Sequence, residues 1–167
     1  MRKVYFVAIF CVFTTIGFAQ NVAVVNGKPI EGKEFMWLFK KNHSGNANVS
    51  YEDLLSYLNL YINFKLKVLE AKNLQLDQDT AYLAEIRKYE SALKAQKRLS
   101  KTSAEYSYTL NEYKEAVLMF NISEIKIWNK AQDEEAQIEL EKAWVDSLRK
   151  HYLIKLNHDQ IKKMAKP

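Results

Sequence analysis

Three histidines are the first residues of this chain to consider for chemistry, because imidazole binds metal ions and transfers protons near neutral pH. His43 lies in a polar segment, His151 near the end of a helical pattern and His158 near the start of another. None of them has the HExxH spacing that places two imidazoles on one helix face. The chain also has no GxSxG motif and no glycine-rich phosphate loop. We therefore expect surface histidines, with no catalytic residue, no metal ion and no cofactor.

A second candidate for chemistry is the acidic segment that begins at Asp133 and continues through Glu134, Glu135, Glu139 and Glu141. Two of these carboxylates could act as general acid and base. Charged residues at this density are, however, typical of a solvated helix face. Near a helix N-terminus they also interact favourably with the helix dipole. We expect this structural role.

The first nineteen residues have the pattern of a secretory signal. Arg2 and Lys3 precede an uncharged apolar run, residues 4–13, and Gly17 and Ala19 place small residues at positions −3 and −1 of a cleavage site. We predict that the signal is cleaved after Ala19 and that the mature chain is periplasmic.

Two other roles are open to this N-terminal segment, a membrane anchor and a lipid attachment site. An uncleaved anchor needs about 20 apolar residues to cross the membrane, and residues 4–19 are fewer, so we expect no stable membrane insertion. Lipidation of Cys11 is not expected, because Phe10 rather than a small residue precedes it. Cleavage removes this only cysteine and, with Arg2 and Lys3, lowers the formal charge from +5 to +3. That charge does not indicate binding of nucleic acid.

Two short strand patterns lie at opposite ends of the mature chain. Residues 22–25 are rich in β-branched side chains and precede Asn26-Gly27, a strong signal for a tight turn. Residues 152–156 alternate between apolar and polar side chains. Because an isolated strand is not stable in water, we predict that these two segments pair and tie both ends of the chain to its body.

The remainder is predicted to be mainly helical, because glycine and proline are scarce. Ser50 and Asp53 resemble a capping box, and Asp77 or Asp79 can cap the next helix. We expect Leu83 to face inward. The predicted helices cover about residues 31–41, 50–72, 80–100, 105–130, 133–151 and 157–164.

The third and fourth of these helices carry the features that bear on partners. The third is basic, which we attribute to a solvated face, with an anionic partner as the alternative. In the fourth, Phe120 is expected on the inward apolar side. The mature chain has more aromatic residues than one core of this size needs, so we expect most in the core and some in a groove for apolar segments of another chain. The basic residues are Arg87, Lys88, Lys94, Lys97, Arg98 and Lys101.

Four segments of the mature chain carry a resemblance: residues 22–30, 60–76, 112–128 and 140–157. In this order they resemble the SurA-like and PpiD/PrsA-like periplasmic foldases in the versions typical of Bacteroidota. Residues 22–30 (VAVVNGKPI) are similar to the strand ending in VNGxxI that precedes their first helix. Residues 60–76 resemble their hinge helix and short loop, and residues 112–128 the segment before the parvulin domain. Residues 140–157 resemble their C-terminal helix and strand. The resemblance covers nearly the whole mature chain.

The resemblance implies a mainly α fold: a SurA N-terminal-like helical chaperone domain with a small sheet of N- and C-terminal strands. Residues 20–132 and 133–167 would form one module. Family members carry one or two parvulin isomerase domains between the third and fourth segments, whereas residues 128–140 leave no room for one here. No catalytic residue can therefore be assigned from the family.

These observations lead to one main hypothesis and two alternatives. The main one is a periplasmic holdase that binds unfolded or nascent envelope and outer-membrane proteins without isomerase activity. The alternatives are a non-catalytic partner subunit, bound to a parvulin-type isomerase or to itself, and a residual prolyl isomerase. The candidate client-binding residues are Met36, Phe39, Tyr61, Phe64, Leu118, Met119 and Trp128.

Overall fold

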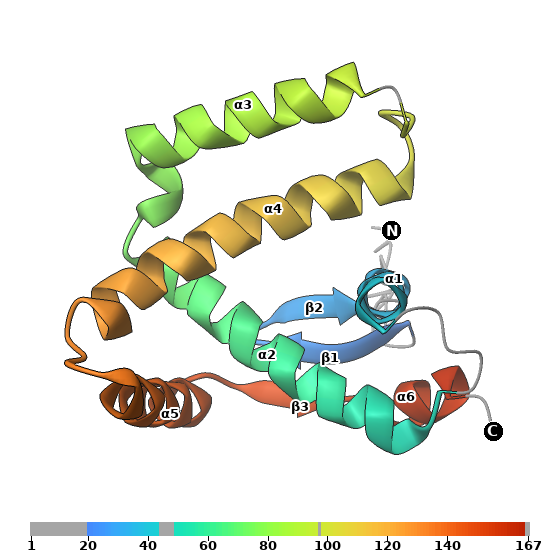
Figure 1. Cartoon of the computed structure of the whole chain (residues 1–167). Coiled ribbons are helices and arrows are strands. Elements are labelled where there is room, and N and C mark those ends of the chain that lie inside the picture. The colour runs from blue at the N-terminus through green and yellow to red at the C-terminus, as the bar shows by residue number, and fades with distance from the viewer. Residues whose placement is uncertain (1–19, 44–48, 97, 166–167) are drawn as a thin grey trace, which may run out of the picture.

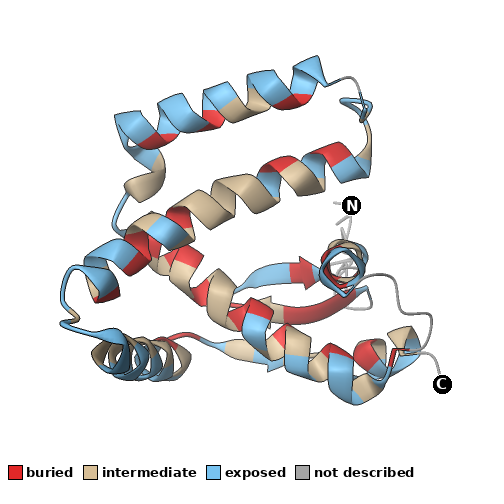
Figure 2. Ribbon diagram, viewed as in Figure 1, coloured by how far each residue is buried: buried red, intermediate tan, exposed pale blue. Residues whose placement is uncertain are grey.

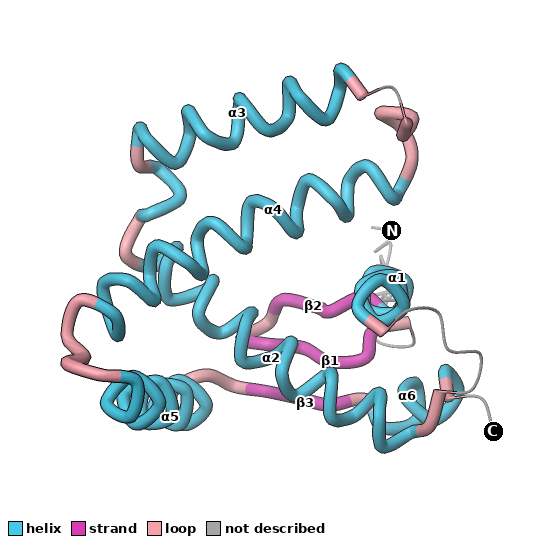
Figure 3. Tube along the Cα trace, in the orientation of Figure 1, coloured by secondary structure: helices cyan, strands magenta, loops and turns pink. Residues whose placement is uncertain are grey.

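The computed structural model of the chain describes residues 20–43, 49–96 and 98–165. The predicted signal and its cleavage site lie outside these residues. As expected, the fold is mainly α with one small antiparallel sheet (Figures 1 and 3). Its elements are β1 (Asn21–Val25), β2 (Lys28–Glu31), α1 (Gly32–Asn42), α2 (Tyr51–Asn73), the 3-10 turn η1 (Leu76–Gln78), α3 (Thr80–Ala95), α4 (Ala104–Ser123), the π-helical turn η2 (Glu124–Trp128), α5 (Glu134–His151), β3 (Ile154–Leu156) and α6 (His158–Met164).

The predicted pairing of the two terminal strands is confirmed. β1 lies at the centre of the sheet, in the order β2-β1-β3, and pairs antiparallel with β3, so that Val24 is opposite Lys155. The backbone N–H of Asn157 extends this pairing by donating to the carbonyl of Val22 at 2.9 Å. The sheet therefore joins the start of the described chain to its end.

The strand β2 was not predicted, since residues 28–31 contain Pro29, which lacks the N–H that a central strand needs. β2 is an edge strand, where proline is tolerated, and it forms a hairpin with β1. At the turn, Asn26 and Gly27 have φ of +47° and +78°, the left-handed values that a two-residue type I′ turn requires. The tight-turn prediction at Asn26-Gly27 is confirmed, and the helix begins at Gly32.

Helix caps follow the sequence closely. Ser50 and Asp53 form the predicted capping box, in which the backbone N–H of Asp53 donates to Ser50 Oγ at 3.0 Å and the backbone N–H of Ser50 donates to Asp53 Oδ2 at 3.3 Å. Of the two candidates for the next cap, Asp79 is the one used, accepting from the backbone N–H of Ala81 at 2.8 Å. Each box or cap pairs backbone donors that would otherwise lack an intrahelical partner.

The core divides into a main cluster and two smaller ones. The main cluster packs the sheet, α1 and α2 around fully buried residues such as Phe35 and Ile62, and it includes Leu148 and Ile161 from the C-terminal segment. A second cluster joins the C-terminal half of α2 to α3 and α4. A third, around Leu93, lies between α3 and α4 alone. In Figure 2 the outer side of α3 is exposed and its buried residues face α4, so the two helices form an arm that extends from the main body.

Two expectations about inward-facing residues were wrong. Leu83 is 39% exposed and Phe120 is 55% exposed, because the α3–α4 arm is covered by other elements on too few sides to bury both. The helix expected over about residues 105–130 is present as α4 to Ser123, and it continues as the π-helical turn η2 to Trp128. No helix in the described ranges combines the length and apolarity needed to cross a membrane.

Candidate functional site

A groove of about 270 Å³ lies where α4 passes over α2, with α1 at one end. Its most exposed apolar side chain is Leu60, which is 66% exposed although it belongs to a helix that crosses the centre of the fold. We call this hollow the apolar groove, and its wall consists of Leu38, Asn42, Tyr57, Leu60, Tyr61, Phe64, Glu112, Glu115 and Ala116.

The sequence of α2 explains how one helix serves both the core and this groove. Leu58, Ile62 and Leu66 repeat at a spacing of four and are fully buried in the main core. Leu60 and Phe64 lie on another side of the same helix, because each residue is rotated by about 100° from the last. Apolar residues on two sides of α2 therefore supply both a core face and a partly exposed face.

Beside the groove, one lysine connects three helices. Lys65 of α2 forms an ion pair with Glu115 of α4 at 2.5 Å and lies 3.9 Å from Glu34 of α1. The three side chains are only 17–22% exposed. Tyr61 donates a hydrogen bond to Glu34 Oε1 at 3.4 Å, and the Lys65 ammonium lies 5.0 Å from the centre of the Tyr61 ring. Two carboxylates therefore share one partly buried cation.

Burial determines the electrostatics of this cluster. It raises the pKa of Glu34 above the ordinary value of 4.5, against the opposing effect of Lys65. Burial also raises the pKa of Tyr61, and the charge of Glu34 raises it further, so that the phenol stays protonated and remains a donor. The cluster has the features of a structural junction, since its acidic groups are paired with a cation or a phenol.

A second, more exposed set of contacts joins the N-terminal half of α4 to α1. Lys41 forms an ion pair with Glu112 at 2.5 Å, with the two side chains 48% and 29% exposed. The rings of Trp37 and Tyr108 are 5.7 Å apart. These contacts hold α4 above α1 at the end of the apolar groove.

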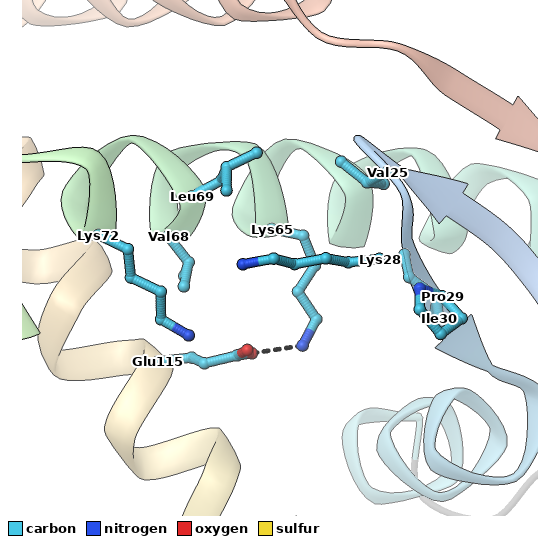
Figure 4. Close-up of a pocket in the computed structure, with 9 residues that line it drawn as sticks. All are labelled: Val25, Lys28, Pro29, Ile30, Lys65, Val68, Leu69, Lys72 and Glu115. Atoms are coloured by element: carbon cyan, nitrogen blue, oxygen red, sulfur yellow. Dashed lines mark hydrogen bonds and ion pairs between the residues drawn. The ribbon is translucent and has the colours of Figure 1, made fainter.

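A smaller cavity of about 180 Å³ lies on the other side of the Lys65–Glu115 pair, between the β1–β2 hairpin and α2 (Figure 4). Three of its wall residues are Lys28, Lys65 and Lys72, and we call it the basic cavity. Its remaining walls are Val25, Pro29, Ile30, Val68, Leu69 and Glu115. Glu115 also lines the apolar groove, so the two hollows share this residue as part of their walls.

The structure brings only two of the seven predicted binding residues into the apolar groove. Tyr61 and Phe64 both line it, with their rings stacked at 5.9 Å. Trp128 is 39% exposed, but it contacts Phe120 edge-on at 4.8 Å and is not part of the groove wall.

Of the other four predicted residues, two are buried in the core and two are partly buried against it. Phe39 is 4% exposed in the main core and also stacks on the exposed His43, and Leu118 is fully buried between α2 and α4. Both side chains are therefore core residues outside the groove wall, and their role in client binding stays a prediction. Met36 and Met119 are partly buried against the main and second core clusters. Long apolar side chains on crossing helices are as well suited to a core as to a groove, and the sequence alone does not separate the two.

Several groove residues were not predicted as binding residues. They include Leu38, Leu60 and Ala116. The ion pair of Lys65 with Glu115 joins residues 50 positions apart, so no local pattern indicates it. A usable signal was the apolar residue Leu60 on the side of α2 away from Leu58 and Ile62.

The described residues contain no group of three or more His, Cys, Asp and Glu side chains that could hold a metal ion. Each histidine contacts a different aromatic residue. His43 stacks on Phe39, His158 Nδ1 lies 2.7 Å from the Tyr51 hydroxyl, and His151 contacts Tyr152. By their chemistry, the apolar groove suits apolar groups and the lysines of the basic cavity suit anionic groups.

Comparison of the chain with protein-family models, with curated proteins and with solved structures found no significant match.

Proposed function

We propose that this protein is an exported holdase that binds apolar segments of unfolded envelope or outer-membrane proteins in the apolar groove. The observation that carries the proposal is the position of Leu60, a large apolar side chain 66% exposed in the wall of a hollow beside Phe64 and Ala116. Apolar surface left exposed in a concave site favours association with apolar side chains of another chain. The secretory pattern and the resemblance to periplasmic foldases also support this function.

The dimensions of the groove suit weak and reversible binding. A volume of about 270 Å³ accommodates a few side chains rather than a folded surface. Burying one large apolar side chain contributes roughly 1.5–3 kcal/mol, and part of that is lost to ordering of the client. Each client segment would therefore bind with modest affinity and dissociate without an energy source, as a holdase outside the cytoplasm requires.

The test is suppression of aggregation. A urea-unfolded outer-membrane β-barrel protein is diluted into buffer with and without a several-fold excess of the mature chain, and light scattering is recorded. We expect the chain to reduce scattering and Leu60→Ser to weaken that effect. The matched control is Ile138→Ser on α5, which removes an apolar side chain of similar exposure, 63%, outside the groove wall.

Two results would contradict the proposal. The first is unchanged scattering at several-fold excess of the wild-type chain. The second is an equal loss of protection in Leu60→Ser and Ile138→Ser, which would assign the effect to general surface apolarity rather than to the groove.

A second candidate function is that of a partner subunit, bound to a parvulin-type isomerase or to another copy of this chain. The exposed aromatic pair Phe120 and Trp128, with Ile125 44% exposed between them in sequence, favours it. Size-exclusion chromatography with light-scattering detection distinguishes the two. A stable oligomer that Phe120→Ser dissociates would support the subunit function, and a monomer at all concentrations, alone and with a parvulin protein, would exclude it.

A further inference from the structure

The basic cavity combines an apolar floor with an excess of positive charge. Val25, Ile30 and Val68 are each less than 5% exposed and form its floor. Among the wall residues, three lysines face one glutamate, and that glutamate is paired with Lys65.

The other two lysines have no acidic partner. Neither Lys28 nor Lys72 forms an ion pair with a carboxylate in the described part of the chain. Figure 4 shows their side chains reaching into the same space, Lys28 from β2 and Lys72 from α2. Two ammonium groups directed into one hollow repel each other, so an anion between them would be stabilised by both.

The size of the cavity limits what that anion is attached to. Its volume of about 180 Å³ is below the roughly 300–1,000 Å³ of sites that enclose a drug-sized ligand. An apolar cavity of about 150 Å³ holds a benzene molecule. The basic cavity therefore has room for one side chain with an adjacent charged group, and not for the long acyl chains of a lipid.

The position of the cavity indicates where the rest of the ligand lies. Glu115 lines both the basic cavity and the apolar groove, and its ion pair with Lys65 lies between them, so a client segment would have to cross this pair to occupy both. The groove offers apolar wall residues, and the cavity adds an apolar floor with two lysines that have no acidic partner.

We propose that the basic cavity binds a carboxylate of the client polypeptide, with Lys28 and Lys72 as its cationic partners, while the preceding apolar residues occupy the apolar groove. This inference rests on the proposed function, since it assigns part of the client. The carboxylate belongs either to the C-terminus of the client or to an aspartate or glutamate side chain near it.

The test uses a fluorescein-labelled octapeptide of alternating Ser and Phe that ends in Phe, with a free C-terminal carboxylate or a C-terminal amide. Fluorescence anisotropy measures its binding to the mature chain. We expect the free acid to bind about tenfold more tightly than the amide, the effect of one charge-assisted contact that is partly open to water. In Lys28→Gln/Lys72→Gln the two peptides should bind equally, whereas Lys72→Arg should retain the preference.

Two further arms complete the design. The matched control is Lys88→Gln, which removes an exposed lysine of α3 that does not line the cavity, and it should keep the tenfold preference. An amidated peptide with Asp at its last position identifies the source of the charge. If it binds as tightly as the free acid, a side-chain carboxylate serves equally well, and if it binds as weakly as the plain amide, the site selects a chain terminus.

The outcomes separate this inference from the proposed function. Equal binding of free acid and amide to the wild type, together with weaker binding to Leu60→Ser, would overturn the carboxylate site and leave the groove intact. An undiminished preference in Lys28→Gln/Lys72→Gln would overturn it as well. If neither peptide binds and aggregation is not suppressed, both proposals fail.

Discussion

Replacing Lys65 with Met should destabilise the protein more than the loss of an exposed ion pair of the same length would. Lys65 is the only cation within ion-pairing distance of both Glu34 and Glu115 in the described chain, and all three side chains are about four-fifths buried. Met keeps most of the aliphatic length of lysine, so packing against Tyr61 changes little. The substitution removes the charge and leaves two partly buried carboxylates facing each other.

The magnitude follows from burial. Removing one partner of a fully buried pair costs about 3–5 kcal/mol, and an exposed pair contributes about 0–1 kcal/mol. Because the exposed fractions here are 17–22%, water still reaches the carboxylates. We therefore expect Lys65→Met to lower the free energy of unfolding by about 2 kcal/mol.

The chain contains a matched control. Lys41 pairs with Glu112 at 2.5 Å, the same distance as Lys65 to Glu115, and it also connects to α4 and lies near an aromatic ring. The difference is exposure, 48% and 29%. Urea unfolding followed by circular dichroism should show a loss of no more than about 0.5–1 kcal/mol for Lys41→Met.

A compensated variant tests the cause. Adding Glu34→Gln and Glu115→Gln to Lys65→Met removes the unpaired charges and should recover most of the lost stability. The reasoning is refuted if Lys41→Met and Lys65→Met cost the same, or if the compensated variant is as unstable as Lys65→Met.

Three further predictions concern stability. Ser50→Ala removes the capping box of α2 and should cost about 1 kcal/mol in urea unfolding, and a loss within error would show that the cap is redundant. Leu58→Ala, at a fully buried site, should lower the free energy of unfolding by about 2–5 kcal/mol. Leu60→Ala, two residues away, should lower it by no more than about 0.5 kcal/mol, and similar losses in the two variants would contradict the assignment of Leu60 to an open groove. Burial raises the pKa of Glu34 in the folded protein above its ordinary value of 4.5. The stability that the protonated carboxyl contributes is therefore complete below pH 4.5 and is lost as the pH rises through the raised pKa. Unfolding measured from below pH 4.5 to neutral pH should therefore show the wild type losing stability relative to Glu34→Gln, and parallel curves would refute this.

Local features of the fold were predictable because local chemistry causes them. Asn26-Gly27 adopts positive φ at little cost, and Ser50 with Asp53 pairs the free N–H groups at the start of α2. The pairing of β1 with β3 was predictable for a different reason, since an unpaired strand at each end of the chain leaves backbone groups without partners. β2 was missed because Pro29 is compatible with a strand only at a sheet edge, and edge position is a tertiary property.

What the sequence determined by itself was the mainly helical fold, its caps and its turn, which depend on residues a few positions apart. The functional surface depended on the tertiary structure. Phe39 and Leu118 looked like binding residues and are buried, whereas Leu60 lies in the groove and the basic cavity lies between elements from three parts of the chain. Hydrophobicity indicates that a side chain avoids water, but only the packing of α4 across α2 decides whether the protein buries it or leaves it for a partner.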